Sequence, residues 1–253
     1  MMKLGIDIGA ENTKVAIVKN GDVLSLVSVG TGSEQYAAVE KGIKQALEKI
    51  DKSKKDIKQI KVTGVGKKAI PDITKEEVNE ISAAAKGALF FFPSSRVVID
   101  VGAEEARAAR IDSEGKIKDF AVNEKCAAGA GSFVEAMAKA LEIPVEELSK
   151  IALESKKKTP MNAQCAIFAE SEVVSLIHAG FTKADISKAI HDAVADRIAG
   201  MARRAGIEKD VVVIGGVAKN IGFIDALKRA LNMDILVCAN PEYVGAIGAA
   251  ISE

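Results

Sequence analysis

Two cysteines stand in segments of small residues, each just before a stretch that is predicted to form a helix. Cys126 lies in NEKCAAGAGSF and Cys165 in NAQCAIFAESE. A [4Fe–4S] cluster is usually held by four cysteine thiolates, so one copy of the chain offers half a ligand set. Two copies that meet across a twofold axis offer a complete one. The positive ends of the following helix dipoles would stabilise such an anionic centre.

The same cysteines have other interpretations. They are 39 positions apart and form no local CxxC pair, so their spacing alone is a weak metal signal. Free cysteines are commonly buried and inert, and a tetrahedral Zn²⁺ shared between two copies is also compatible with the pattern. We expect Cys238 to be a core residue. His178 and His191 lie on predicted helices without a partner motif, and we expect them to be structural or surface residues.

A second constellation surrounds two short turns that follow apolar strands. Asp7 begins the first turn and Asp100 the second, and each is followed two positions later by a glycine. A glycine lets backbone approach a ligand, consecutive backbone N–H groups hold phosphate oxygens, and Mg²⁺ binds few carboxylates through water. Gly215-Gly216 follows a third strand and precedes a helix. These turns therefore predict a site for a nucleotide and Mg²⁺, and no Walker A pattern competes with it.

The candidate residues can be divided by role. Asp7 and Asp100 are expected to position Mg²⁺, Thr13 to offer its hydroxyl and Lys14 its charge to phosphate. The full set predicted to contact the nucleotide is Gly9, Ala10, Glu11, Asn12, Thr13, Lys14, Gly102, Ala103, Gly215, Gly216, Val217 and Asn220.

The elements that must position these residues form a repeated α/β pattern. We expect strands at 3–8, 14–19, 23–29, 57–62, 96–101, 106–111, 116–122, 211–214 and 235–238. We expect helices at 35–50, 75–92, 131–141, 144–154, 166–179, 183–205, 221–231 and 242–251. Because Ile6-Asp7-Ile8-Gly9 is echoed by Ile99-Asp100-Val101-Gly102, the sequence predicts two related lobes with a cleft between them. Residues 1–93 plus 243–253 would form the first lobe and 94–242 the second.

Composition narrows the classes of function. The chain has 253 residues, 48% of them hydrophobic, which suffices for a sizeable core. Equal numbers of basic and acidic residues, 35 each, argue against a nucleic-acid or anionic-membrane surface. Three cysteines are too few for a disulfide framework, so we expect a reduced, cytoplasmic setting, with no signal peptide and no membrane span.

Taken together, three motifs resemble the BadF/BadG/BcrA/BcrD ATPase family: CAAGAGSF from Cys126, CAIFAESE from Cys165 and GGVAKN from Gly215. The resemblance spans essentially the whole chain. It implies the fold of the sugar kinase, actin and Hsp70 superfamily (ribonuclease H-like), with ATP in the cleft. It also implies that a homodimer, or a pair with a similar sister subunit, shares one [4Fe–4S] cluster bound by Cys126 and Cys165. ATP hydrolysis would then drive an electron to an iron–sulfur acyl-CoA reductase or dehydratase.

One motif departs from the pattern of the dehydratase activators, which carry Gly-Gly-Gln-Asp after the second aspartate. Here the segment is Gly102-Ala103-Glu104-Glu105, which is more similar to benzoyl-CoA reductase subunits. Glu104 is the candidate for positioning the attacking water, directly or through Mg²⁺.

Two alternatives of other classes are a small-molecule kinase of the same superfamily and a non-enzymatic ATP-dependent scaffold. Both leave the two cysteine motifs without a role.

Overall fold

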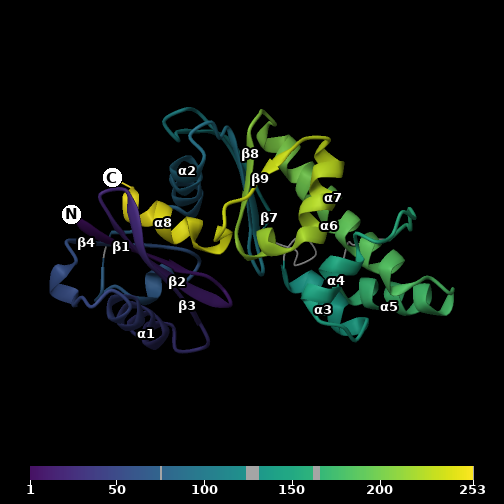
Figure 1. Ribbon diagram of the computed structural model, residues 1–253, viewed down its shortest axis with the longest axis horizontal. Coiled ribbons are helices and arrows are strands. Elements are labelled where there is room, and N and C mark those ends of the chain that lie inside the picture. Colours follow the sequence, from purple (N-terminus) through teal and green to yellow (C-terminus); the bar gives the residue numbers. More distant parts are fainter. Residues whose placement is uncertain (75, 124–130, 162–165, 253) are drawn as a thin grey trace.

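The computed structural model describes residues 1–74, 76–123, 131–161 and 166–252, and it contains two sheets, one in each of two lobes (Figure 1). The first sheet has the strand order β3-β2-β1-β4, where β1 pairs antiparallel with β2 and parallel with β4. Its strands are β1 (Met2–Ile8), β2 (Asn12–Lys19), β3 (Asp22–Gly30) and β4 (Gln59–Thr63). Helix α1 (Gln35–Glu48) packs against β2 and β3. Asn20 and Gly21 both take positive φ in the β2–β3 turn, as an Asn-Gly hairpin requires.

The second sheet repeats this plan. Its order is β7-β6-β5-β8-β9, with β5 antiparallel to β6 and parallel to β8. The strands are β5 (Val97–Val101), β6 (Ala106–Ile111), β7 (Ile117–Asn123), β8 (Val211–Ile214) and β9 (Ile235–Leu236). All four residues of β8 are buried aliphatics, as expected of a central parallel strand that is covered on both faces.

Two helices lie between the sheets. Helix α2 (Glu80–Phe91) packs closely on α8 (Val244–Ile251), and α8 in turn packs on β1, β2 and β4 (Figure 1). The contact is backbone to backbone, because a Cβ on Gly248 would lie 1.8 Å from the carbonyl oxygen of Ala83. The opposite side of α2 joins a buried cluster with Val98, Ala109 and Val212 of the second sheet. The α2–α8 pair therefore connects the lobes.

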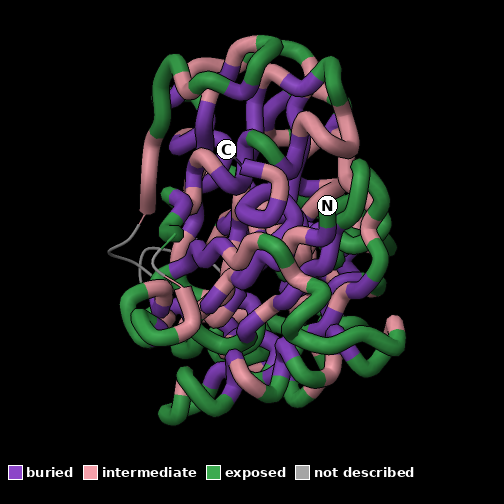
Figure 2. Tube along the Cα trace, turned by 90° about the vertical axis from the view of Figure 1, so that its left-hand side faces the viewer, coloured by how far each residue is buried: buried purple, intermediate pink, exposed green. Residues whose placement is uncertain are grey.

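The remaining helices are α3 (Gly131–Ala140), α4 (Val145–Ile151), α5 (Ala166–His178), α6 (Lys183–Ala205) and α7 (Ile221–Leu231). Of these, α6 packs on the second sheet, and the others extend from it as a helical group in which α5 packs on α3 and α6. These helices share the largest buried cluster with β5, β6 and β8, and Figure 2 shows buried backbone in the interior and exposed segments over the outside. No helix in the described ranges combines the length and the apolar character that a bilayer crossing requires.

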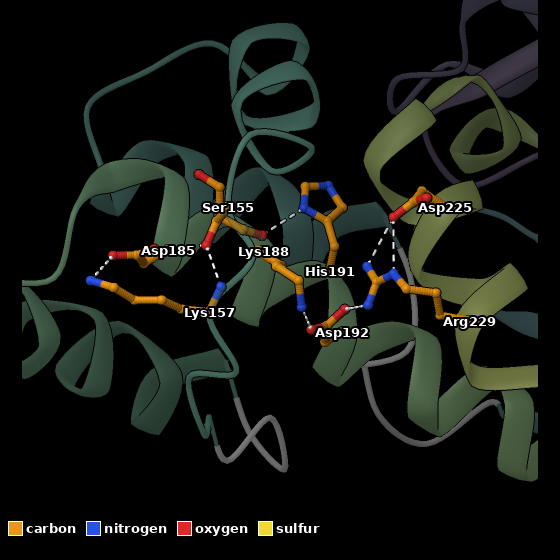
Figure 3. A network of polar contacts seen from close by, with 9 residues as sticks. Ser155, Lys157, Asp185, Lys188, His191, Asp192, Asp225 and Arg229 are labelled. Atoms are coloured by element: carbon orange, nitrogen blue, oxygen red, sulfur yellow. Dashed lines mark hydrogen bonds and ion pairs between the residues drawn. The ribbon is translucent and has the colours of Figure 1, made fainter.

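A polar network ties this helical part together (Figure 3). Asp185 accepts hydrogen bonds from the Ser155 hydroxyl (2.7 Å) and the Lys157 ammonium (3.0 Å), and these bonds lower its pKa. Further along α6, Asp192 accepts from Nη1 of Arg229 on α7 at 2.7 Å. The first group of contacts joins α6 to the chain that follows α4, and the second joins α6 to α7.

The two histidines take structural or surface positions in this part of the fold, as predicted. His191 is fully buried, its Nδ1 lies 2.7 Å from the Ser187 carbonyl oxygen, and burial lowers its pKa. His178 is exposed at the end of α5.

The predicted helix at 75–92 was wrong in its first turn, since α2 begins at Glu80. The segment before it is extended along β4: the N–H of Val62 donates to the Glu76 carbonyl, and that of Val78 to the Val62 carbonyl at 2.8 Å. Asn79 then caps the helix by accepting from the N–H of Ile81 at 2.9 Å.

Several other predicted elements are longer than the observed ones, and the structure gives a local reason for three of them. The strand expected at 235–238 ends at Leu236, because β9 pairs only with Val211 and Val212. The helix expected at 144–154 spans 145–151, and Pro144 is its N-cap with extended backbone rather than part of its first turn. The helix expected at 242–251 begins at Val244, after a 3₁₀ turn at Pro241–Tyr243.

Candidate functional site

A cleft of about 900 Å³ lies between the two lobes. Fourteen of the fifteen residues predicted to bind or act on a nucleotide line it. They are Asp7, Gly9, Ala10, Glu11, Asn12, Lys14, Asp100, Gly102, Ala103, Glu104, Gly215, Gly216, Val217 and Asn220. The fold thus brings the turns of both lobes to one cavity.

Thr13 does not line the cleft. Its side chain is fully buried, and its hydroxyl lies 3.0 Å from that of Thr31, which donates to the Gly9 carbonyl at 2.9 Å. The geometry therefore gives Thr13 a part in holding the first turn in shape, rather than the phosphate contact predicted for it.

The two aspartate turns have the same backbone. In the first, the N–H of Gly9 donates to the Asn12 carbonyl at 3.1 Å; in the second, the N–H of Gly102 donates to the Glu105 carbonyl at 2.9 Å. The sequences align over eight positions, of which four are identical: DIGAENTK at 7–14 and DVGAEEAR at 100–107. Each aspartate is therefore directly opposite a basic residue of the neighbouring antiparallel strand, Lys14 or Arg107.

Each aspartate also has a glycine close to its carboxylate. This glycine follows the parallel strand that neighbours the strand of the aspartate. Gly64 follows β4 with φ +93°, and a Cβ there would lie 2.5 Å from the Ile8 carbonyl oxygen and 2.6 Å from Oδ1 of Asp7. Gly215 follows β8 with φ +88°, and a Cβ there would lie 2.3 Å from the Val101 carbonyl oxygen and 2.7 Å from Oδ1 of Asp100. Both positions need a residue without a side chain.

The two aspartates are half-buried. Burial raises the pKa of Asp7 and of Asp100, and the positive charges of Lys14 and Arg107 oppose this rise. The Lys14 ammonium lies 3.7 Å from Oδ2 of Asp7. Within the described residues Asp100 has no ion pair. A divalent cation would favour the charged form of both carboxylates.

The cleft as a whole is rich in negative charge. Its described lining has four basic residues, Lys14, Arg107, Lys150 and Lys219, and nine acidic ones: Asp7, Glu11, Glu80, Asp100, Glu104, Glu105, Glu135, Glu146 and Glu242. A polyphosphate would be repelled by this excess unless it entered with a cation, so the charge balance fits a nucleotide complexed with Mg²⁺. No described group of three or more His, Cys, Asp or Glu side chains is arranged to hold a metal by itself.

The second lobe supplies a wall with both apolar and polar groups. Val134 of α3, Val145 of α4 and Ile221 of α7 line it, together with Ser149 and Lys150 of α4. Mixed walls of this kind suit the flat base and the hydroxyls of a nucleoside. Near them Glu242 contacts the Lys219 ammonium through Oε1 at 3.1 Å, while its buried Oε2 has no hydrogen-bond partner among the described residues.

Several lining residues were missed from the sequence. Arg107 and Glu105 form an ion pair in the second turn, and Glu80, at the start of α2, accepts from the Lys67 ammonium at 2.7 Å. Comparison of the two turns over all eight positions, instead of the first four, would have identified Arg107 as the counterpart of Lys14. Glu80 and Gly64 have no such signal, because the fold alone brings them to the cleft.

The predicted metal ligands, Cys126 and Cys165, lie outside the described residues. The helices that follow them, α3 and α5, pack against each other. At the start of α3 the N–H of Gly131 donates to the Gly102 carbonyl and that of Ser132 to the Ala103 carbonyl, both at 2.9 Å. The helix after the Cys126 segment is thus bonded directly to the second aspartate turn. Cys238, expected in the core, is half-buried beside a hydrophobic cluster, and burial raises its pKa.

Known proteins share this architecture. The structure of the activator of 2-hydroxyisocaproyl-CoA dehydratase from Clostridium difficile, which was solved with bound ADPNP, matches with a TM-score of 0.92 at 36% identity, covering 99% of this chain and 93% of that one. A ROK family glucokinase from Streptomyces griseus matches with a TM-score of 0.60 at 15% identity, covering 99% and 98%. This second match concerns the fold alone, and it confirms the predicted fold class.

Two relatives with similar sequences are also named for acyl-CoA dehydratases or reductases. The activator of lactoyl-CoA dehydratase from Anaerotignum propionicum is 41% identical over 254 residues, covering 99% of this chain and 96% of its own length. A benzoyl-CoA reductase subunit from Thauera aromatica is 27% identical over 258 residues, covering 98% and 91%. Over the whole chain the similarity to the lactoyl-CoA dehydratase activator is therefore the greater one, although the segment Gly102–Glu105 pointed to the reductase subunits.

The sequence profile of one family matches residues 4–252. This confirms the resemblance of the motifs, and the chain belongs to the BadF/BadG/BcrA/BcrD ATPase family.

Proposed function

We propose that this protein is an ATP-hydrolysing electron donor that activates a partner iron–sulfur acyl-CoA dehydratase or reductase. The observation that carries the proposal is the direct backbone connection between the second aspartate turn and α3, the helix that follows the Cys126 segment. A turn that senses a phosphate is thereby joined to the segment that holds a predicted cluster ligand.

The cleft supports the ATP half of the proposal. Backbone around Gly9 and Gly102 would receive the phosphates, Asp7 and Asp100 would hold Mg²⁺ through water, and Glu104 would orient the attacking water. The excess of carboxylates in the lining fits a ligand that brings a cation. The buried Oε2 of Glu242, which has no hydrogen-bond partner in the described ranges, fits a ligand that brings a hydrogen-bond donor. The base and ribose would lie against α3, α4 and α7, between Val134, Val145 and Ile221.

The cysteines support the electron-transfer half. With Cys126 and Cys165 of two subunits as ligands, a [4Fe–4S] cluster would supply one-electron chemistry at low potential. The chain itself would couple this site to the nucleotide. Gly131 is held tightly, since a Cβ there would lie 3.1 Å from the Val217 side chain and 3.4 Å from the Gly102 carbonyl. A shift of the second turn on ATP binding would therefore move the start of α3 rather than be absorbed by loose packing.

The assembly follows from the ligand count. Because each chain offers two cysteines at these positions, the cluster requires a homodimer or a pair with a similar sister subunit. The partner enzyme would receive the electron, and lobe closure around ATP would change how α3 of each subunit presents the cluster to it.

The test is anaerobic purification of the wild type and of three single variants, Cys126→Ser, Cys165→Ser and Cys238→Ser, with iron, zinc, sulfide and ATPase assays. The wild type should contain about four iron and four sulfide per dimer and should hydrolyse ATP. The first two variants should lose the iron and the dimer while they keep ATP binding. Cys238→Ser is the matched control and should keep all three properties.

Two results would contradict the proposal. Full iron content in either Cys126→Ser or Cys165→Ser would exclude the bridging cluster, and zinc in place of iron would exclude electron transfer. A colourless wild type that phosphorylates a small molecule would indicate a kinase instead.

A further inference from the structure

Arg107 is a basic residue of the cleft lining that the sequence motifs left without a role. It lies on β6 directly opposite Asp100, its side chain is 17% exposed, and it lines the cavity. Burial raises the pKa of Asp100 and of Asp7, and the positive charge of Arg107 opposes both rises; the same charge adds to the lowering of the pKa of Glu80. Carboxylates of both lobes therefore lie within electrostatic range of one guanidinium.

The guanidinium has a single partner in the described part of the chain. Its Nη2 donates to Oε2 of Glu105, which lies two residues before it in the second aspartate turn. An arginine carries five N–H donors, so most of its donors are not used by the described residues. In the first lobe the position of Glu105 is occupied by Asn12, a neutral side chain, and Lys14 is close to Asp7 instead.

We propose that Arg107 binds the terminal phosphate of the nucleoside triphosphate, and that Glu105 holds it in place until the nucleotide arrives. This inference rests on the proposed function and adds a residue and a regulatory exchange to its ATP site. A terminal phosphate offers more negative charge and more acceptor oxygens than a carboxylate, and it matches the planar guanidinium in two-point geometry. The phosphate therefore displaces Glu105, whereas a nucleoside diphosphate lacks the group that would do so.

The exchange has a structural consequence. Glu105 accepts, through its own carbonyl, the N–H of Gly102, and the Gly102 carbonyl accepts from Gly131 at the start of α3. Release of the Glu105 side chain leaves its negative charge without a counter-ion on the same turn that is bonded to α3. The presence of the terminal phosphate is thereby reported to the helix after the Cys126 segment.

A double-mutant cycle tests the exchange. The dissociation constants of ADPNP and ADP, each with Mg²⁺, are measured by calorimetry for the wild type, Arg107→Ala, Glu105→Gln and the double variant. Arg107→Ala should weaken ADPNP binding by about 10- to 100-fold and ADP binding much less, as loss of a charged hydrogen bond implies. Glu105→Gln should strengthen ADPNP binding about three- to tenfold, and this gain should vanish when Arg107 is also replaced.

Two further variants serve as controls, one for the loss of positive charge and one for the general effect of replacing an arginine on this strand. Arg107→Lys keeps the charge and the fold, and should recover part of the lost affinity but not all of it. Arg110→Ala is the matched control, since Arg110 lies on the same strand outside the cleft lining and pairs with Glu208 at 3.0 Å; it should leave both dissociation constants unchanged.

The inference is overturned if Arg107→Ala affects ADP and ADPNP equally, or if the gain from Glu105→Gln persists without Arg107, because that gain would reflect only the removal of a negative charge. If the wild type binds neither nucleotide, the proposed function fails. If it binds both and the variants behave like it, only the role of Arg107 fails.

Discussion

In the first lobe, Asp7 lies 3.7 Å from the lysine that faces it across the sheet, whereas in the second lobe the arginine that faces Asp100 is paired with Glu105. The two turns otherwise share backbone hydrogen bonds, cross-strand register and a closing glycine. The same backbone therefore carries two different charge arrangements. Asp7 has a counter-ion of its own, whereas Asp100 has no ion pair among the described residues.

Replacement of the aspartates gives the largest expected effect. Asp100→Asn should lower the kcat of ATP hydrolysis about 10³-fold and Asp7→Asn about 10²-fold, in the range found when a charge-stabilising group is removed from an active site. Steady-state ATPase assays measure both. Asp234→Asn, at a fully exposed position, is the control. Equal losses of kcat in the two variants would show that Asp7 and Asp100 contribute equally to ATP hydrolysis.

The closing glycines test whether the backbones are equivalent. Gly64→Ala and Gly215→Ala each force a Cβ within about 2.5 Å of a carbonyl oxygen at positive φ. Each should cost about 2–3 kcal/mol of unfolding free energy, or roughly 4–12 °C in the unfolding midpoint. Gly200→Ala in α6, where a Cβ meets nothing within 4 Å, should instead stabilise by up to about 1 kcal/mol. A large loss of unfolding free energy in only one of the variants Gly64→Ala and Gly215→Ala would show that the two turn backbones are not equivalent.

The pH dependence of nucleotide binding distinguishes the carboxylates. Because burial raises the pKa of Asp7 and Asp100, they take up protons at a higher pH than exposed aspartates. The affinity for Mg²⁺–ADPNP should fall, about tenfold per unit, once the pH drops below the raised values. Protonation also relieves the cost of burying the charges, so these two groups favour the folded state in acid. In calorimetric titrations, Asp100→Asn should show a flatter profile, and an unchanged profile would count against Asp100.

The smallest expected effect comes from making the first turn resemble the second. Asn12→Glu places a carboxylate where Glu105 stands in the other lobe, and it should attract Lys14 away from the phosphates. We expect the dissociation constant of ADPNP to rise about threefold, as for a partly exposed ion pair. Tighter ADPNP binding by Asn12→Glu would show that a carboxylate at this position does not draw Lys14 away from the phosphates.

Much of the fold could be predicted because local signals agree with tertiary packing. The bounds of β6, β8, α6 and α7 match the expected ranges, and α6 begins at a capping box formed by Thr182 and Asp185. The start of α2 could not be predicted, because residues 76–78 pair with β4, a contact that depends on distant chain.

The lining of the cleft could be predicted in outline for a similar reason. Glycines and aspartates indicate tight turns in any sequence, so the two loops were visible. The roles of Thr13 and Arg107 were not, because whether a side chain faces the cleft or the core depends on the sheet as a whole. The cluster ligands and the division of the chain at residues 93 and 243 stay predictions.

The position of α8 has a consequence for synthesis. Ala16 and Val18 of β2 are covered by Ala246, Ile247 and Ala250 near the end of the chain. During synthesis, the first sheet is therefore made before α8, the helix that covers this apolar face of β2. A chain that stops before residue 244 would leave this face of β2 without the helix that covers it.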